Sequence, residues 1–450
     1  MTEERRRGRE GGRGREGGRE GGRGREGGRE RGRGRKRGAE EEILGYLKAL
    51  VRVPTFVPPG ENYGEIVDWL VPIFEGFGFE CERVEMPEAV FKERQKTAEL
   101  SGARVNLLAT KDFGVAETVV IYTHLDVVPA GEGWSTPPFP AEPVVKDGRV
   151  YGRGVADSKG AVAALLTALN KMKERGLESR YNLRVALTTD EELGLYSGLC
   201  YFADEGLLQG DFLLCMDGDN EGVCVATDGV LNWELKVFGQ SCHSSVPFLG
   251  VNAVEAAGLV IGELASLKKK VESRESRAAC SPRMSELTGR RHTTAVFNVT
   301  MVSGGVKENI IPASCTLRGD RRYIPEERVE EVVQEFEEAV ENIRRRHGLE
   351  LELRCEPGFP PMFTDPDEDW VKRVQAAASN SFGVQKEIIG VQGGLDVGYA
   401  VQKTGQPVCA FGVGSSVESN AHGADENVRL QDLENYVRFL VRLLGSTSTK

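Results

Sequence analysis

The sequence has no apolar run long enough to span a bilayer, and no hydrophobic segment near its start of the kind that a secretory signal peptide needs. It also lacks any Cys-x-x-Cys pair. The nine cysteines are scattered, and several, such as Cys215 and Cys409, lie in apolar strand-like runs. These absences argue against a membrane protein and against a disulfide framework. We therefore expect a cytoplasmic protein with reduced, buried thiols.

Apolar residues beyond Met1 are missing from residues 1–38, which repeat Arg, Gly and Glu. Such a segment has nothing to bury, and we expect a disordered tail. Its 15 basic and 7 acidic residues give +8, and because the whole chain carries −11, the remainder carries −19. This acidic body argues against nucleic-acid binding. The tail is the only segment that is a candidate for nucleic-acid binding. Its glutamates and its lack of aromatic residues argue against that role as well.

Histidine is scarce, with five in 450 residues, so the surroundings of each one are informative. A β-branched, apolar run over residues 118–122 predicts a buried strand that delivers His124 and Asp126 at its carboxyl end. Such strand ends are where open α/β sheets bind ligands. His422 lies in a second acidic setting, the run Ser-Asn-Ala-His-Gly-Ala-Asp-Glu. Both settings are typical of metal sites.

Carboxylates recur at the ends of other predicted elements. Asp157 stands just before a helical pattern, Asp217 ends a predicted strand, and a Thr-Asp-Glu-Glu run at residues 189–192 ends another. Nitrogen and oxygen ligands gathered from several strand ends are how a protein builds a pocket for a divalent metal. The number of ligands suggests two ions that share Asp157. The predicted metal ligands are His124, Asp157 and Asp217 for the first ion, and Asp157, Glu192 and His422 for the second.

Glu191 is left without a metal in this scheme. An unligated carboxylate beside a hydroxide that bridges two metals is what a hydrolase needs as general base. Asp126, two residues after His124, is the natural partner that fixes the tautomer of the imidazole. The residues thus predict a catalytic role for Glu191 and a supporting one for Asp126.

Four motifs in this order resemble the dinuclear zinc exopeptidase and deacylase family. They are His-x-Asp after a strand, Gly-Arg-Gly-x-x-Asp-x-Lys-Gly at residues 152–160, Thr-Asp-Glu-Glu, and Ala-His near the end. The family includes glutamate carboxypeptidase, peptidase V-type dipeptidase, acetylornithine deacetylase, succinyl-diaminopimelate desuccinylase and aminoacylase. The resemblance implies the same five metal ligands, with Glu191 as general base. This sequence departs from that of many relatives at Asp217, where Met-Asp-Gly replaces Gly-Glu-Pro.

A second block resembles the lid that this family inserts into its catalytic domain. It implies that His243, in the run Cys-His-Ser-Ser, polarises the substrate carbonyl, in dimeric members that of the partner subunit. Asn309 and Arg322 match the family's Asn-x-Ile-Pro and Asp-x-Arg-x-x-Pro patterns, and Arg322 would grip a substrate carboxylate. Gly394 lies in a substrate-facing loop, where Leu395 replaces the usual hydroxyl residue. Arg322 also has a plainer reading as part of a solvated basic strand.

The fold that we expect is α/β, with a mixed, mostly parallel sheet and helices on both faces, plus an inserted α+β lid or dimerisation domain. Its predicted parts are the tail (1–38), the catalytic domain (39–229 and 357–450) and the lid (230–356). We expect the first helix over residues 40–50 and a last one over 430–444. Within the lid, helices are predicted over 252–267 and 325–346, strands over 294–302, 315–323 and 349–354, and a long loop between 268 and 291.

These features predict a metal-dependent hydrolase that cleaves a peptide or N-acyl amide bond in a small substrate with a free carboxylate. The expected cofactor is two Zn²⁺ per chain, with Co²⁺ or Mn²⁺ as alternatives. A dipeptidase or carboxypeptidase is favoured. The alternative is an N-acyl-amino-acid deacylase, such as a succinyl-diaminopimelate desuccinylase or acetylornithine deacetylase. The predicted partners are the substrate and, through the lid, a second copy of the chain, with no membrane.

Overall fold

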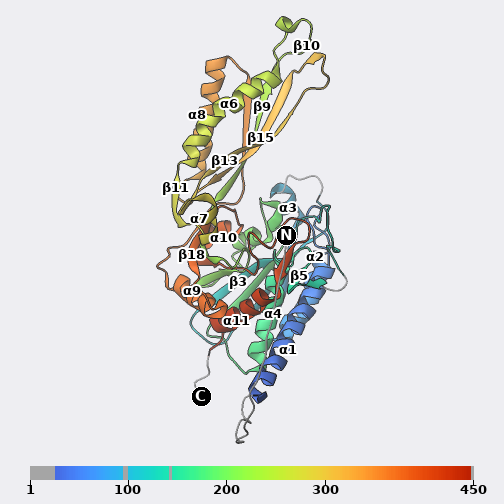
Figure 1. Ribbon diagram of the computed structural model, residues 1–450, viewed down its shortest axis with the longest axis vertical. Helices are drawn as coiled ribbons and strands as arrows, with labels where there is room; N and C mark the ends of the chain where they lie inside the picture. Colours follow the sequence, from blue (N-terminus) through green and yellow to red (C-terminus); the bar gives the residue numbers. More distant parts are fainter. Residues whose placement is uncertain (1–25, 95–99, 141–143, 447–450) are drawn as a thin grey trace, which may run out of the picture.

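The protein consists of a body built on one large sheet and an elongated inserted region, which we call the lid, that extends from it, as the computed structural model shows (Figure 1). The structure describes residues 26–94, 100–140 and 144–446, with side chains from residue 38 onward. In this part of the chain, none of the helices combines the length and the apolar character that a bilayer span needs.

The central sheet has the strand order β1-β2-β6-β3-β7-β19-β8-β17, and β18 also pairs with β8. Its middle, β6-β3-β7-β19, is parallel, whereas β1, β2 and β17 pair antiparallel with their neighbours. Its strands are β1 (Glu80–Met86), β2 (Arg104–Lys111), β3 (Thr118–His124), β6 (Asn182–Thr188), β7 (Phe212–Cys215), β8 (Gly222–Thr227), β17 (Met362–Phe363), β18 (Glu387–Val391) and β19 (Val408–Ala410).

Both faces of this sheet are covered by helices, because its central strands are apolar on both sides. In β3, Val119 and Ile121 join one core cluster, and Val120 and Tyr122 join the other. This is the pattern of a parallel strand between two helical layers. One layer comprises α1 (Glu26–Arg52), α2 (Tyr63–Gly76), α4 (Lys159–Glu174), α9 (Asp369–Phe382) and α11 (Leu430–Leu444). The other comprises α3 (Glu88–Arg94), α5 (Gly198–Asp204) and α10 (Val397–Thr404).

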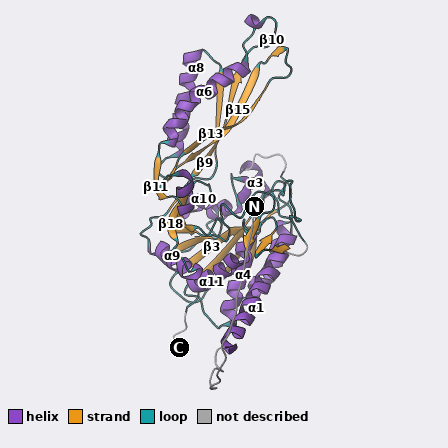
Figure 2. Cartoon of the chain, viewed as in Figure 1, coloured by secondary structure: helices purple, strands orange, loops and turns teal. Residues whose placement is uncertain are grey.

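The lid, residues 229–357, has a four-stranded antiparallel sheet in the order β13-β15-β9-β16. Two long helices, α6 and α8, pack on one face of it (Figure 2). Burial alternates along β9, as expected for a sheet with one covered face. The main elements of the lid are β9 (Gly229–Phe238), α6 (Ala253–Glu272), β13 (Val296–Gly304), β15 (Ser314–Tyr323), α8 (Val329–His347) and β16 (Leu351–Pro357).

Smaller elements complete the lid and its junction with the body. At its far end are β10 (Cys242–His243), the 3-10 turn η2 (Pro247–Leu249) and β14 (Ile310–Ile311). Near the body are β11 (Glu275–Ala279), α7 (Pro282–Thr288) and β12 (His292–Thr294). The mixed α/β fold with an inserted α+β region, predicted from the sequence, is confirmed.

Two predicted elements differ from the structure. Residues 268–291 were expected to form a loop, but α6 continues to Glu272, and β11 and α7 follow. The side chain of Ser281 caps α7 by accepting a hydrogen bond from the Met284 amide, and Pro282 occupies the first turn, where its missing amide costs nothing. The first helix begins at Glu26 rather than near residue 40, so it includes part of the segment that we expected to be disordered. Residues 1–25 lie outside the described residues.

A small sheet in the order β20-β5-β4 brings two distant segments together. Its hairpin, β4 (Val144–Lys146) and β5 (Arg149–Tyr151), turns at Asp147 and Gly148, both with positive φ, as in a primed turn. β20 (Asn427–Arg429) pairs with β5. This pairing places the segment that carries His422 beside the segment that leads into α4.

Candidate metal centre

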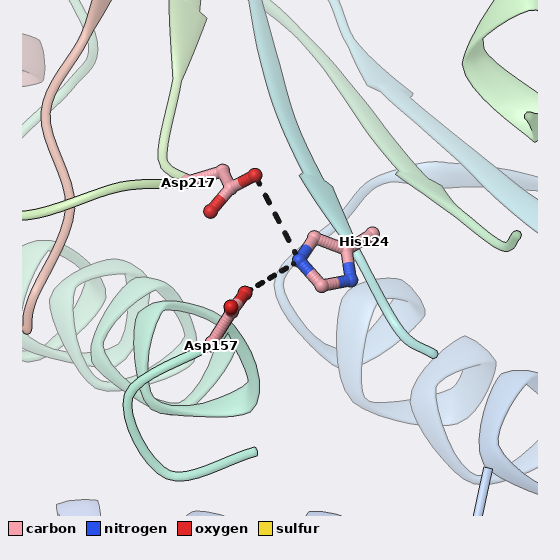
Figure 3. Close-up of side chains that lie close together, drawn as sticks. All are labelled: His124, Asp157 and Asp217. Atoms are coloured by element: carbon pink, nitrogen blue, oxygen red, sulfur yellow. Dashed lines mark hydrogen bonds and ion pairs between the residues drawn. The ribbon is translucent and has the colours of Figure 1, made fainter. Parts of the chain in front are cut away.

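His124 is the last residue of β3, and its buried ring faces two carboxylates (Figure 3). Its Nε2 atom lies 3.0 Å from Asp157 Oδ1 and 3.8 Å from Asp217 Oδ2. Asp157 precedes α4, and Asp217 follows β7, the strand next to β3. The carboxyl ends of two neighbouring parallel strands therefore bring His124 and Asp217 together, and the segment before α4 adds Asp157.

A second group shares Asp157 with the first. Its Oδ2 atom lies 3.2 Å from His422 Nε2, which is 3.0 Å from Glu192 Oε2. One oxygen of Asp157 thus faces each histidine. In each group, the candidate ligand atoms all lie within 4.8 Å of one another. The structure accordingly brings together all five residues predicted as metal ligands, in the two predicted sets.

The chemistry of these groups fits two divalent cations. Imidazole nitrogens and carboxylate oxygens are ligands that zinc, manganese and cobalt accept. Glu192 Oε1 is buried without a hydrogen-bond partner among the described residues, as expected of an atom that faces a cation. Contacts with Asp157 and Glu192 raise the pKa of His422 to about 10. The carboxylates therefore create a strongly negative site that favours bound positive charge.

Asp126 supports two of these candidate ligands at once. Its backbone carbonyl lies 3.0 Å from His124 Nδ1, and its own carboxylate lies 3.5 Å from the same nitrogen. Its Oδ2 atom accepts a hydrogen bond from the Glu192 amide. The shorter contact of His124 Nδ1 is thus with the main-chain carbonyl of Asp126. The other ring nitrogen, Nε2, remains available to bind the candidate metal.

Asp190 shapes the turn that presents Glu191 and Glu192. It has a φ of 66°, a left-handed conformation that aspartate tolerates better than most residues. Its buried carboxylate accepts hydrogen bonds from Tyr63 Oη (2.8 Å) and Arg104 Nε (3.0 Å). These contacts tie the turn that carries both glutamates to α2 and β2.

Glu191 belongs to neither candidate metal group of the described residues, and its side chain is nearly buried. Burial raises the pKa of its carboxyl well above the usual value, and the charges of Asp396 and Asp217 add to this effect. Asp396 is buried behind it, where it accepts a hydrogen bond from Tyr122 Oη at 2.6 Å. Sequence reasoning gave Asp396 no role, because its partner in β3 is 274 residues away.

A buried ion pair between Arg153 and Glu426 also escaped sequence reasoning. Glu426 accepts hydrogen bonds from Arg153 Nη1 (2.6 Å) and from the amides of Ala156 (2.9 Å) and Asp157 (3.2 Å). Arg153 Nη2 also donates to the carbonyl of His422 at 3.2 Å. The pair therefore links the backbones of two candidate ligands. The sequence features that could have indicated this ion pair are the position of Arg153 within Gly-Arg-Gly and an acidic residue four positions after His422.

The four residues predicted to act from the lid or the substrate loop fall into two places. Arg322, in β15 at the base of the lid, lies beside Gly394, whose added Cβ would be 3.6 Å from Arg322 Nη1. Arg322 donates to Asp320 at 2.8 Å. His243 and Asn309 lie together at the far end of the lid, where both are exposed and the Ser244 amide donates to the Asn309 carbonyl (Figure 1). They do not approach the candidate metal groups of their own chain.

Comparison with known proteins agrees with this site. A succinyl-diaminopimelate desuccinylase of Acidovorax ebreus is 29% identical over 396 residues, which cover 86% of this chain and 93% of that protein. An uncharacterised metallohydrolase of Methanocaldococcus jannaschii is 28% identical over 361 residues, which cover 76% of this chain and 84% of that one.

Among solved structures, a metallo-carboxypeptidase of the M20 family from Sulfolobus solfataricus has the same fold, with a TM-score of 0.71 and 20% identity. The match covers 89% of this chain and 98% of that one. The family described as Peptidase family M20/M25/M40 matches residues 120–446, which include all five candidate ligands. The protein is thus a metal-dependent hydrolase, and its chain belongs to peptidase family M20/M25/M40.

Proposed function

We propose that this hydrolase cleaves a peptide or N-acyl amide bond in a small substrate that carries a free carboxylate. The observation that carries the proposal is the pair of ligand groups joined by Asp157, with Glu191 beside them but in neither. His124, Asp157 and Asp217 would hold one cation, and Asp157, Glu192 and His422 the other. Zn²⁺ suits this nitrogen and oxygen donor set, with Co²⁺ or Mn²⁺ as alternatives.

When bound, the two cations would polarise the substrate carbonyl and lower the pKa of water in the site. The chain's own residues perform the proton transfers. Glu191 takes a proton from the attacking water and returns it to the leaving amine. Asp126 holds the ring of His124 in one orientation through the contact with Nδ1. Arg322, near Gly394 at the base of the lid, would bind the substrate carboxylate.

A homodimer is part of this proposal. His243 and Asn309 lie away from the metal groups of their own chain, so they can serve a site only if it belongs to a partner. The end of the lid carries exposed apolar side chains, among them Phe248 (80% exposed) and Val306 (92% exposed). Apolar residues gathered at one place on the surface are typical of an interface. We propose that this end of each lid reaches the partner's site, where His243 stabilises the developing oxyanion.

A deacylase that releases an N-acyl group from an amino acid is the second candidate. It is favoured by the likeness to succinyl-diaminopimelate desuccinylases, which extends over most of the chain. The two candidates share one mechanism and differ only in the group on the acyl side of the amide. All nine cysteines are free, as expected of a reducing compartment, and we propose a cytoplasmic location.

The test is a substrate panel assayed with metal analysis of the same samples. Dipeptides, N-acetyl amino acids and N-succinyl amino acids would be compared after loading the purified chain with Zn²⁺, Mn²⁺ or Co²⁺. We expect hydrolysis of at least one class, about two metal ions per chain at full activity, and loss of activity with a chelator. Full activity with one ion per chain would contradict the shared role of Asp157.

A further inference from the structure

A cavity of about 220 Å³ opens directly beside the candidate metal centre. Asp157 and Asp217 are among its lining residues, and its walls are largely apolar, with Val391 and Leu395 contributing to them. Ligand pockets for whole drug-sized molecules occupy about 300 to 1,000 Å³. This cavity is smaller, which suits a single substrate side chain or acyl group next to the scissile amide.

The charges around this cavity are all of one sign. None of its lining residues in the described part of the chain is Lys or Arg, and besides the two candidate ligands the lining includes Asp219. Lys386 interacts with Asp219, but it is buried and donates to the carbonyl of Asn220. Bound cations would be held by the candidate ligands, and Asp219 is not one of them. An anionic group along the apolar wall would therefore lose its water without a Lys or Arg side chain of the lining to pair with.

The apolar wall of the cavity favours the binding of an aliphatic group. Leu395 is half-buried against the core on one side of the sheet, and its aliphatic side chain lines the cavity. Val391, at the end of β18, is 38% exposed, so its side chain faces accessible space. An aliphatic group that fills the cavity would gain the free energy of removing apolar surface from water.

We infer that this cavity selects an uncharged aliphatic side chain or acyl group and rejects an anionic one. The inference rests on the proposed function and specifies its substrate class. The preferred substrates are then dipeptides or N-acyl amino acids with a branched aliphatic group beside the scissile bond. A succinyl group, which ends in a carboxylate, would be a poor substrate.

The experiment compares kcat/KM for dipeptides in which one position is Leu, Glu or Lys and the other is Gly, in both orders, together with N-isovaleryl and N-succinyl amino acids. For the wild-type protein we expect aliphatic substrates to exceed anionic ones by on the order of tenfold or more. Val391→Lys places a cation at the wall of the cavity and should shift that ratio toward anionic substrates by about tenfold. Val384→Lys is the matched control, because Val384 is exposed and does not line the cavity.

A binding measurement keeps this inference separate from the proposed function. Isovalerate and succinate share one carboxylate that can reach the metal centre and differ in the group that would enter the cavity. Calorimetry with the metal-loaded protein should show tighter binding of isovalerate, and Val391→Lys should reverse the order. If no amide is hydrolysed, the proposed function fails, while this measurement still decides the inference. Equal or tighter binding of succinate by the wild-type protein would overturn it.

Discussion

Two adjacent glutamates with the same chemistry occupy different positions in this site. Glu192 Oε2 lies 3.0 Å from His422, within a candidate metal group, whereas Glu191 lies outside both groups. The turn at Asp190 separates them. Identical substitutions at the two positions should therefore have different consequences.

Glu191→Gln should keep about two metal ions per chain and lose several orders of magnitude in kcat, because it removes the base without removing a ligand. Glu192→Gln should lower the affinity for one of the two ions, because a neutral amide replaces a charged ligand. Metal content after dialysis and single-substrate kinetics measure both effects. If Glu191→Gln instead lost a metal ion and Glu192→Gln retained both, the two residues would exchange roles.

At the scale of the elements, the backbone around α4 and the segment that bears His422 are held by one buried ion pair. Glu426 accepts from Arg153 and from the Asp157 amide, so it supports two candidate ligands without touching either side chain. Because the pair is almost fully buried, removing one partner leaves the other charge uncompensated.

Glu426→Gln should lower metal affinity by about 10- to 100-fold, the effect typical of residues that orient ligands. The readout is calorimetric titration of metal into the apoprotein, which does not depend on turnover. Glu418→Gln is the matched control. Glu418 lies on the same segment and pairs with Arg149 at the surface, where ion pairs contribute little. Equal effects of the two substitutions would show that Glu426 has no special role.

The connection between β8 and β9 contains another buried carboxylate, in addition to that of Glu426. Asp228 is 1% exposed, and its Oδ2 atom has no hydrogen-bond partner among the described residues. Burial raises its pKa to about 8, against the lowering influence of Arg322. The folded state therefore holds this proton more tightly than the unfolded chain does. The stability that results is fully present below the unfolded pKa near 4 and is lost as the pH rises through about 8.

Asp228→Asn should remove this pH dependence. Relative to the wild-type protein, the variant should gain stability between pH 5 and pH 9, by on the order of 1 kcal/mol or more. Thermal unfolding across this range measures the difference. Asp320→Asn, which removes a partly exposed carboxylate beside the same arginine, should show a much smaller change. A melting-temperature difference for Asp228→Asn that stays constant with pH would contradict the expectation.

Local sequence patterns predicted the strand ends and the residues on them. The apolar run of β3 and the positions of His124 and Asp217 sufficed to predict that these two side chains lie close together, because parallel strands bring their carboxyl ends to one edge of the sheet. The Arg153–Glu426 pair could not be predicted, since its partners lie 273 residues apart and no periodicity relates them. The elements β11 and α7 were missed because they are short and polar, and a local cap and one strand pairing define them.

At the scale of the whole molecule, the elongated lid separates His243 from the metal groups of its own chain (Figure 1). The family resemblance predicted a role for His243, but the sequence alone gave no indication of how far the lid extends. If the lid reaches a partner's site, each active site combines the body of one subunit with the lid end of the other. In a closed dimer with twofold symmetry, both active sites receive the lid end of the other subunit.

Mixing His243→Ala chains with Glu191→Gln chains tests this arrangement. Each variant alone should be nearly inactive, since one lacks the group that binds the oxyanion and the other lacks the base. In a mixed dimer, the site whose body retains Glu191 receives the intact lid of the other chain. With random exchange at equal amounts, half of the dimers are mixed and each has one such site, so roughly a quarter of the wild-type activity should return. Mixing His243→Ala with Asn309→Ala, both at the lid end, should restore nothing, because every mixed site then receives an altered lid. If subunits demonstrably exchange and the first mixture stays inactive, His243 does not act in the partner's site.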